Sequence, residues 1–196
     1  MGLKERVARR FLRGLRRAGV KRDDVIVVPV DDRVQSYAAL ILLRELEEGY
    51  DTVLRAMVLG EVPECFGGAL EGYEVRRLDF SPRSYSEFKE AVLGVSGEGE
   101  FVVLPFVAED LAVALLSEVA VSVWRQFRLD VARRVSYPLG GTLLGEVEAL
   151  YGGCGGAGFY GGESAVELLE GLRGRVVATA LSKVYLRLAG GLRGVG

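Results

Sequence analysis

The sequence predicts a three-layer α/β fold, in which helices cover both faces of a doubly wound, mainly parallel sheet of about five strands. Two short apolar runs without helical period, 25–28 and 101–106, are typical of strands buried on both faces of such a sheet. Each run is followed by a helical pattern, and strands that alternate with helices over short connections favour parallel pairing. With 196 residues, 49% of them hydrophobic, the chain is long enough to form one well-filled core.

The chain begins with an amphipathic pattern over residues 3–18 that Gly19 ends. We therefore expect residues 1–20 to form a basic helix packed on a single α/β domain of residues 21–196. Ser84 or Ser86 would cap a helix in the middle of the chain. Further strands are expected at 52–59, 73–79 and 135–139, and further helices at 34–48, 85–93, 109–124, 142–151, 163–172 and 176–188.

Composition excludes several classes of function. The longest apolar run, 111–124, contains polar residues and is too short to span a bilayer, and no secretory signal precedes it, so we expect a cytoplasmic protein without a membrane segment. Histidine is absent, which rules out histidine-based nucleophile pairs and histidine-ligated metals. The two cysteines, Cys65 and Cys154, lie far apart in unlike contexts, which argues against a disulfide framework or a zinc site.

Positive charge is concentrated in two places. Residues 1–22 hold nine basic side chains and one acid, although the net charge of the whole chain is −2. A second cluster surrounds Trp124 and Phe127. Such clusters indicate contact with the phosphates of a nucleic acid, and the alternative is a solvated helix face. The candidate RNA-binding residues are Arg6, Arg9, Arg10, Arg13, Arg16, Arg17, Arg125, Arg128, Arg133 and Arg134.

The loop after the first buried strand is the expected ligand site, because helix amides point into the crevice at the carboxyl edge of a parallel sheet. This loop has no glycine to let a phosphate approach the backbone, and it carries two carboxylates. A second pair of acids follows the strand at 101–106. The residues of this predicted nucleotide crevice are Val30, Asp31, Asp32, Arg33, Gln35, Ser36, Glu109 and Asp110.

A glycine-rich run occupies residues 152–158 and continues at 161–162. A phosphate cradle is one interpretation, but no lysine follows as in a P-loop, so a flexible connector is favoured. Cys154 lies in this run without a neighbouring cation to lower the pKa of its thiol, which favours a structural cysteine over a redox thiol or a sulfur carrier.

Three landmarks in order resemble the PP-loop ATP pyrophosphatases, closest to their tRNA-thiolating branch. The segment 25–43 stands where that family has a strand, an SGGxDS loop and a helix, with Ser36 matching the last serine. The segment 101–112 is similar to the strand and DDxA segment, with Glu109 and Asp110 in the acidic positions. Pro138-Leu139, Glu146-Val147 and Tyr151 resemble the PL…E(V/I)…Y stretch, and Cys154 stands near the place of a catalytic cysteine.

The resemblance implies binding of ATP, adenylation of a tRNA base and insertion of sulfur. Positions 31–35 have lost the phosphate-binding residues of the loop, and the paired cysteines and the zinc-finger cysteines of the branch are missing. We therefore expect a catalytically inactive PP-loop-like protein without a cofactor, which binds tRNA, an active PP-loop thiolation subunit or a second copy of itself. The alternative is an active enzyme that binds ATP or AMP with Mg²⁺ held by Asp31, Asp32, Glu109 and Asp110.

Overall fold

The computed structural model describes residues 1–47, 52–121, 130, 133–160 and 175–192. The strands are β1 (Val25–Val30), β2 (Val53–Leu59), β3 (Glu74–Leu78), β4 (Phe101–Val103) and β5 (Arg134–Ser136). The helices are α1 (Leu3–Ala18), α2 (Val34–Glu47), α3 (Tyr85–Val95), α4 (Ala108–Val121), α6 (Leu144–Tyr151) and α8 (Arg175–Leu192), with short 3₁₀ turns η1 (Glu64–Phe66) and η2 (Gly68–Leu70).

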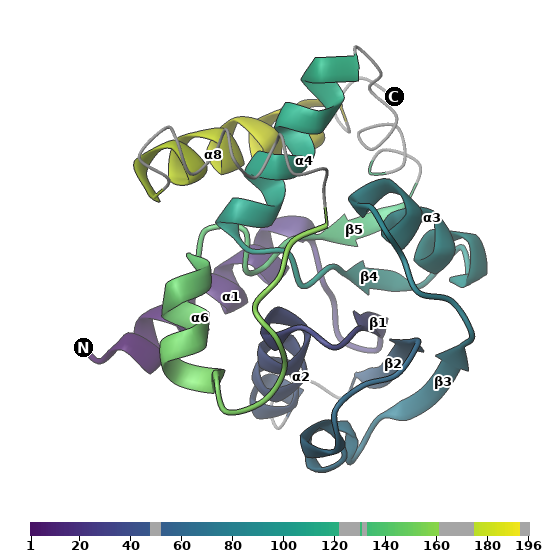
Figure 1. Cartoon of the computed structure of the whole chain (residues 1–196). Coiled ribbons are helices and arrows are strands. Elements are labelled where there is room, and N and C mark those ends of the chain that lie inside the picture. The colour runs from purple at the N-terminus through teal and green to yellow at the C-terminus, as the bar shows by residue number, and fades with distance from the viewer. Residues whose placement is uncertain (48–51, 122–129, 131–132, 161–174, 193–196) are drawn as a thin grey trace.

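The five strands form one sheet in the order β3-β2-β1-β4-β5, and every neighbouring pair is parallel (Figure 1). The chain leaves β1 toward one edge and returns at β4 toward the other, which makes the sheet doubly wound. The fold class expected from the sequence is confirmed. The point where the strand order reverses lies between the carboxyl ends of β1 and β4.

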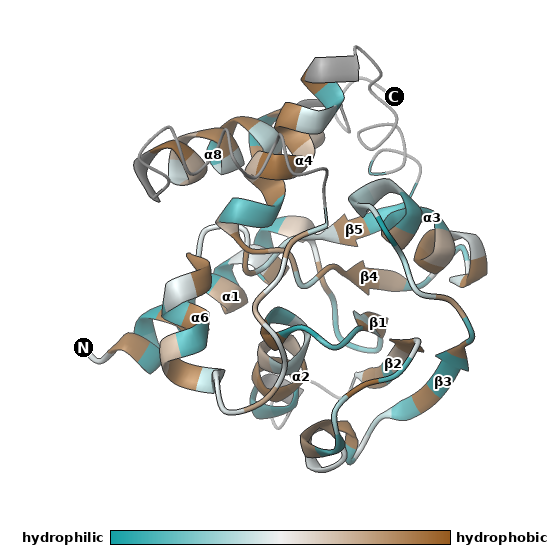
Figure 2. Cartoon of the chain, viewed as in Figure 1, coloured by the Kyte–Doolittle hydropathy of each residue, from teal (hydrophilic) through white to brown (hydrophobic). Residues whose placement is uncertain are grey.

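Side chains of the strands alternate between two cores. Ile26 and Val28 pack toward α1, α2 and α6, whereas Val27 packs toward α3, α4 and α8. Burial of one such side chain stabilises the fold by about 1.5–3 kcal/mol. Figure 2 shows the apolar character of the central strand β4 against the more hydrophilic edge strand β3, whose side chains are mostly exposed. Within the described part of the chain, no helix is long and apolar enough to cross a membrane.

Helix α1 lies on the sheet by its apolar stripe, since Val7, Phe11 and Leu15 are buried. Gly19 ends the helix in the left-handed conformation, with φ 81°, and its N–H donates to Arg16 O at 3.1 Å. The predicted helix over residues 3–18 is confirmed, and its arginines are displayed away from the core.

Some predicted boundaries were wrong for identifiable reasons. Strand β1 runs two residues further than expected, because its ladder with β2 continues to the Val30 and Val58 pair. Strand β4 ends at Val103, and Pro105, two residues on, has no N–H to donate to a ladder. Ser84 is the cap of α3, with its Oγ accepting from Glu87 N at 3.2 Å, and α3 continues through Gly94. The predicted helix at 163–172 and the end of the one at 109–124 lie outside the described residues.

Candidate functional site

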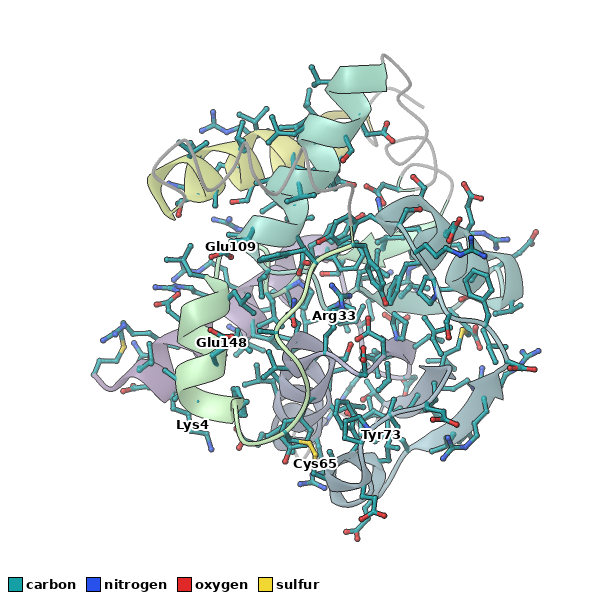
Figure 3. The ribbon with its side chains drawn as sticks, viewed as in Figure 1. Lys4, Arg33, Cys65, Tyr73, Glu109 and Glu148 are labelled. Carbon is teal, nitrogen blue, oxygen red and sulfur yellow. A yellow bond between two sulfur atoms is a disulfide. The ribbon has the colours of Figure 1, made fainter. Side chains whose placement is uncertain are left out.

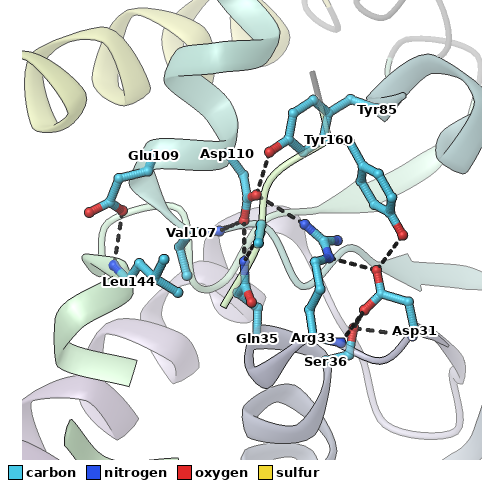
Figure 4. Close-up of polar contacts among 11 residues, drawn as sticks. Asp31, Arg33, Gln35, Ser36, Tyr85, Val107, Glu109, Asp110, Leu144 and Tyr160 are labelled. Carbon is cyan, nitrogen blue, oxygen red and sulfur yellow. Dashed lines mark hydrogen bonds and ion pairs between the residues drawn. The ribbon is translucent and has the colours of Figure 1, made fainter. Parts of the chain in front are cut away.

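The predicted nucleotide crevice lies at the reversal point of the sheet, where parallel α/β folds usually bind ligands. Asp31 follows β1 directly, α2 begins three residues later, and Asp110 lies in the first turn of α4 after β4. Figure 4 shows these side chains converging on Arg33. The two loops that the sequence assigned to the crevice therefore meet at the carboxyl edge of the sheet.

Arg33 fills the centre of the crevice. Its Nε donates to Asp31 Oδ2 at 2.6 Å, and its Nη1 donates to Asp110 Oδ1 at 3.1 Å. The guanidinium carbon lies 4.2 Å from the centre of the Tyr160 ring, within cation–π range. The residue is only 4% exposed, so its charge is paired inside the protein and is not presented to solvent.

Asp31 takes the position that a bound anion would occupy at the start of α2. Its Oδ1 accepts from Ser36 Oγ at 2.6 Å and from Arg33 N at 3.2 Å. The amide of Val34 donates to Gly156 O at 3.0 Å, and the amides of Ser36 and Tyr37 donate to Arg33 O. Because these amides already have acceptors within the chain, a phosphate would have to displace a carboxylate and a backbone carbonyl to reach them.

The two buried carboxylates have opposite pKa shifts. Burial alone would raise the pKa of Asp31, but the Arg33 guanidinium and hydrogen bonds from Ser36 and Tyr160 outweigh it and leave this pKa below its ordinary value. Burial dominates at Asp110 and raises its pKa, against the effects of Arg33 and of the Tyr85 hydroxyl, which donates to Asp110 Oδ1 at 2.6 Å. The same carboxylates raise the pKa of Arg33, which stays charged.

A covering segment, residues 152–160, crosses the β1–α2 loop after α6 (Figure 1). Gly156 N donates to Asp32 O at 2.9 Å, and Tyr160 Oη donates to Asp31 Oδ2 at 2.7 Å. At Gly155, φ is +86° and a Cβ would lie 2.7 Å from Val34 N, so the close approach requires glycine. The prediction of a flexible connector at 152–158 was wrong, since this run is bonded to the loop it covers.

The covering segment is also fixed covalently. Cys65, in η1, forms a disulfide with Cys154, 89 residues later in the chain (Figure 3). Cys154 is 6% exposed and lies in the core that α2 covers. The expectation that the cysteines do not pair was wrong, because separation along the sequence does not limit how closely two segments approach once the sheet has formed.

Of the remaining crevice residues, only Gln35 joins the side chains around Arg33 and Asp110. Val30 is the buried last residue of β1, and Asp32 is exposed. Glu109 Oε2 accepts from Leu144 N at 2.9 Å on the far side of α4, and burial raises its pKa. Gln35 Nε2 donates weakly to Asp110 Oδ2 at 3.4 Å. Among the described residues, no group of acidic side chains could hold a metal ion, so the alternative four-carboxylate Mg²⁺ site was wrong.

The predicted RNA-binding arginines differ in how they are engaged. Arg9 pairs with Glu5 in α1, and Arg10 pairs with Glu146 in α6. Arg134 is held by Asp24, with both guanidinium–carboxylate bonds at 2.8 Å, so its charge is balanced within the chain. Arg6 is exposed and donates to Met1 O, Arg133 is half-buried, and Arg13, Arg16 and Arg17 are exposed. Arg125 and Arg128 lie outside the described residues.

Sequence reasoning missed two tyrosines that complete the crevice. Tyr85 begins α3 and Tyr160 ends the covering segment, yet their rings are 5.6 Å apart and their hydroxyls donate to the two carboxylates that flank Arg33. The residues next to each tyrosine in the sequence gave no indication of this role. No sequence signal identifies them, because the contact depends on how three distant segments fold together.

Comparisons with known proteins gave a structural match only. No protein-family model matches the sequence, and no curated protein matches it. Among solved structures, the chain is similar to the U34-tRNA thiolase NcsA from Methanococcus maripaludis with its [4Fe-4S] cluster, with a TM-score of 0.70 and 14% identity over 96% of this chain and 79% of the thiolase chain. At this identity the likeness establishes a shared fold.

The residues of this chain do not fit an iron–sulfur cluster of that kind. Such clusters are held by several cysteine thiolates. The whole sequence has two cysteines and no histidine, and both sulfurs are joined in the disulfide. Sulfur chemistry on a protein-bound cluster is therefore not assigned to this chain.

Proposed function

We propose that this chain is a PP-loop-type protein of tRNA thiolation that acts by binding tRNA and does not itself carry out adenylation. The observation that carries the proposal is Arg33, whose guanidinium is buried between Asp31 and Asp110 in the nucleotide crevice. The fold shared with a U34-tRNA thiolase supports the choice of RNA. The exposed arginines of α1 supply charge suited to phosphates.

Electrostatics argue against a nucleotide triphosphate in this crevice. A phosphate at the start of α2 would lie beside the Asp31 carboxylate, and two like charges 4 Å apart repel by about 1 kcal/mol in bulk water and by about 4 kcal/mol at the effective dielectric constant of a protein site. Arg33 offsets little of this repulsion, because it already forms ion pairs with two carboxylates. Displacing the covering segment would add the cost of its hydrogen bonds to Asp32 and Val34.

The experiment is a pair of binding measurements on one protein preparation. Isothermal titration with ATP and with AMP, with and without Mg²⁺, is expected to show no binding in the micromolar range. Fluorescence anisotropy with labelled tRNA at low salt is expected to show binding that weakens steeply as salt rises. Micromolar ATP binding would contradict the closed crevice, and absence of tRNA binding would contradict the RNA function.

We extend the proposal to a protein partner of this chain. Co-purification with an active PP-loop thiolation protein, or formation of a homodimer, would support this extension. Sedimentation of the purified chain, alone and with such a subunit, measures both.

A second candidate, an active adenine-nucleotide enzyme, is favoured by one specific observation. Among the described residues, Arg33 Nη2 and Gln35 Oε1 are buried polar atoms without a hydrogen-bond partner, and such atoms often bind a ligand or an ordered water. Reduction of the Cys65–Cys154 disulfide would release one anchor of the covering segment. ATP binding that is absent in the oxidised protein and present after reduction would support this candidate.

A further inference from the structure

A basic groove runs along the free edge of β5, between α1 and α8, with a volume of about 640 Å³. Its floor is formed by β5 and the residues that follow it, including Tyr137 and Pro138. The floor packs closely against α1, since a Cβ placed on Gly14 of α1 would lie 2.6 Å from Pro138 Cα. The cations of its walls are Arg10, Arg13 and Arg17 of α1 and Lys183 and Arg187 of α8.

These side chains form two rows that face one groove. Arg10, Arg13 and Arg17 are three and four residues apart, and Lys183 and Arg187 are four apart, so each set lies on one face of its helix. Successive members are about 4.5–6 Å apart along the helix axis. Such a row offers several cations in succession to the phosphates of a nucleic-acid strand.

The charge of the groove is not neutralised by the described residues. Among the described residues, no carboxylate lines the groove, and of its cations only Arg10 has an ion pair, with Glu146 at 2.5 Å. Arg13, Arg17, Lys183 and Arg187 have no ion pair or hydrogen bond within the described ranges. Like charges gathered around a concavity concentrate a positive potential there and attract a polyanion. This is the opposite of the arrangement around Arg33.

The surface chemistry favours backbone phosphates over bases. Among the described residues that line the groove, Tyr137 is the one aromatic side chain. It is only 7% exposed, and its hydroxyl donates to Asp130 inside the protein. Stacking platforms for bases need exposed aromatic rings. Arginine and lysine rows without them position a nucleic acid through its phosphates and carry little sequence information.

We propose that the basic groove binds one run of backbone phosphates of an RNA strand, held from both sides by Arg13 and Arg17 of α1 and by Lys183 and Arg187 of α8. This inference rests on the proposed tRNA-binding function and gives it a location. It assigns a role to the C-terminal helix α8, and it separates the groove arginines of α1 from those on the other faces of the same helix.

The test compares charge-matched variants of the full chain. R13Q/R17Q and K183Q/R187Q each remove two groove cations, and R6Q/R16Q removes two exposed cations of α1 outside the groove. Binding of labelled tRNA is measured by anisotropy across a KCl series. Each groove pair is expected to weaken binding at least tenfold and to reduce the salt slope by about 0.7–0.9 for each phosphate that the variant no longer neutralises. The control pair should weaken binding less than about threefold.

The outcomes separate the two proposals. Equal losses for groove and control pairs would overturn the groove while leaving tRNA binding in place. A wild-type protein that does not bind tRNA at low salt would overturn both. Sodium tripolyphosphate that binds the groove more tightly than tRNA would assign it to a small polyanion and overturn the RNA proposal. Unchanged circular dichroism spectra show that each variant is folded, and all the substituted side chains are exposed.

Discussion

The nucleotide crevice and the basic groove use the same side chain in opposite ways. In the crevice, Arg33 is 4% exposed and bound to two carboxylates of its own chain. In the groove, Arg13 and Arg17 are exposed and have no partner within the described residues. The number of arginines near a site therefore says little about anion binding. What decides it is whether their charge is already neutralised by carboxylates of the protein.

The largest effect should come from breaking the crevice. R33M would leave Asp31 and Asp110 buried without a cation, which costs about 3–5 kcal/mol of unfolding free energy. The groove pair R13Q/R17Q should stay within about 1 kcal/mol of wild type, because surface substitutions rarely cost more. Urea unfolding measures both.

A compensated variant sharpens this test. D31N/R33M/D110N removes both charges together with their partner, and it should recover much of the stability that R33M loses. Equal midpoints for R33M and R13Q/R17Q would show that the buried triad does not distinguish the two regions.

Removing the disulfide should have the next largest effect. Cross-links of this kind contribute about 2–4 kcal/mol, mainly by restricting the unfolded chain. C65S/C154S should therefore lower the thermal midpoint relative to the oxidised wild type, and dithiothreitol should lower the wild-type midpoint to nearly the same value. Groove variants should keep the full response to reduction. A wild-type midpoint that does not change on reduction would contradict a stabilising role for the bond.

Glycine substitutions test how closely the covering segment approaches the loop. G155A should cost about 1–3 kcal/mol, because Gly155 has φ +86° and a Cβ would press on Val34 N. Gly153 lies two residues earlier, and a Cβ added there would meet no heavy atom within 4 Å, so G153A should change stability by about 0.5 kcal/mol or less. Similar losses for both variants, measured by urea unfolding, would contradict the docked arrangement.

The smallest effects should come from Arg134, a cation that its own chain neutralises at the surface. The hydrogen bond from Arg134 lowers the pKa of Asp24. A lowered pKa in the folded protein stabilises it above the ordinary pKa of the carboxyl, and this contribution is lost as pH falls through the folded value. D24N should therefore flatten the fall of the thermal midpoint on acidification below about pH 4.

The same ion pair predicts the RNA-binding behaviour of Arg134. R134Q should leave tRNA affinity within about twofold of wild type, because its charge is balanced by Asp24. A loss as large as that of R13Q/R17Q would place Arg134 on the RNA surface after all.

The sequence predicted the parts of this molecule that depend on local pattern. Apolar runs at 25–28 and 101–106 located two central strands, and the stripe through Phe11 located α1. The carboxyl-edge rule then placed the crevice. Contacts between distant segments could not be predicted from the sequence. These are the Cys65–Cys154 bond and the two tyrosines that complete the crevice around Arg33. Pairing of Arg134 with Asp24 was equally invisible, because charge clusters in a sequence do not show which charges are neutralised by folding.

The most direct test of the account is one comparison on a single oxidised preparation: isothermal titration with ATP and Mg²⁺ beside tRNA binding by anisotropy at low salt. No detectable ATP binding is expected in the micromolar range, because Arg33 and the helix amides already have partners within the chain. Clear, salt-sensitive tRNA binding is expected in the same sample. Micromolar ATP binding by the same sample would contradict the account, because the crevice would then be open to a nucleotide despite its buried ion pairs.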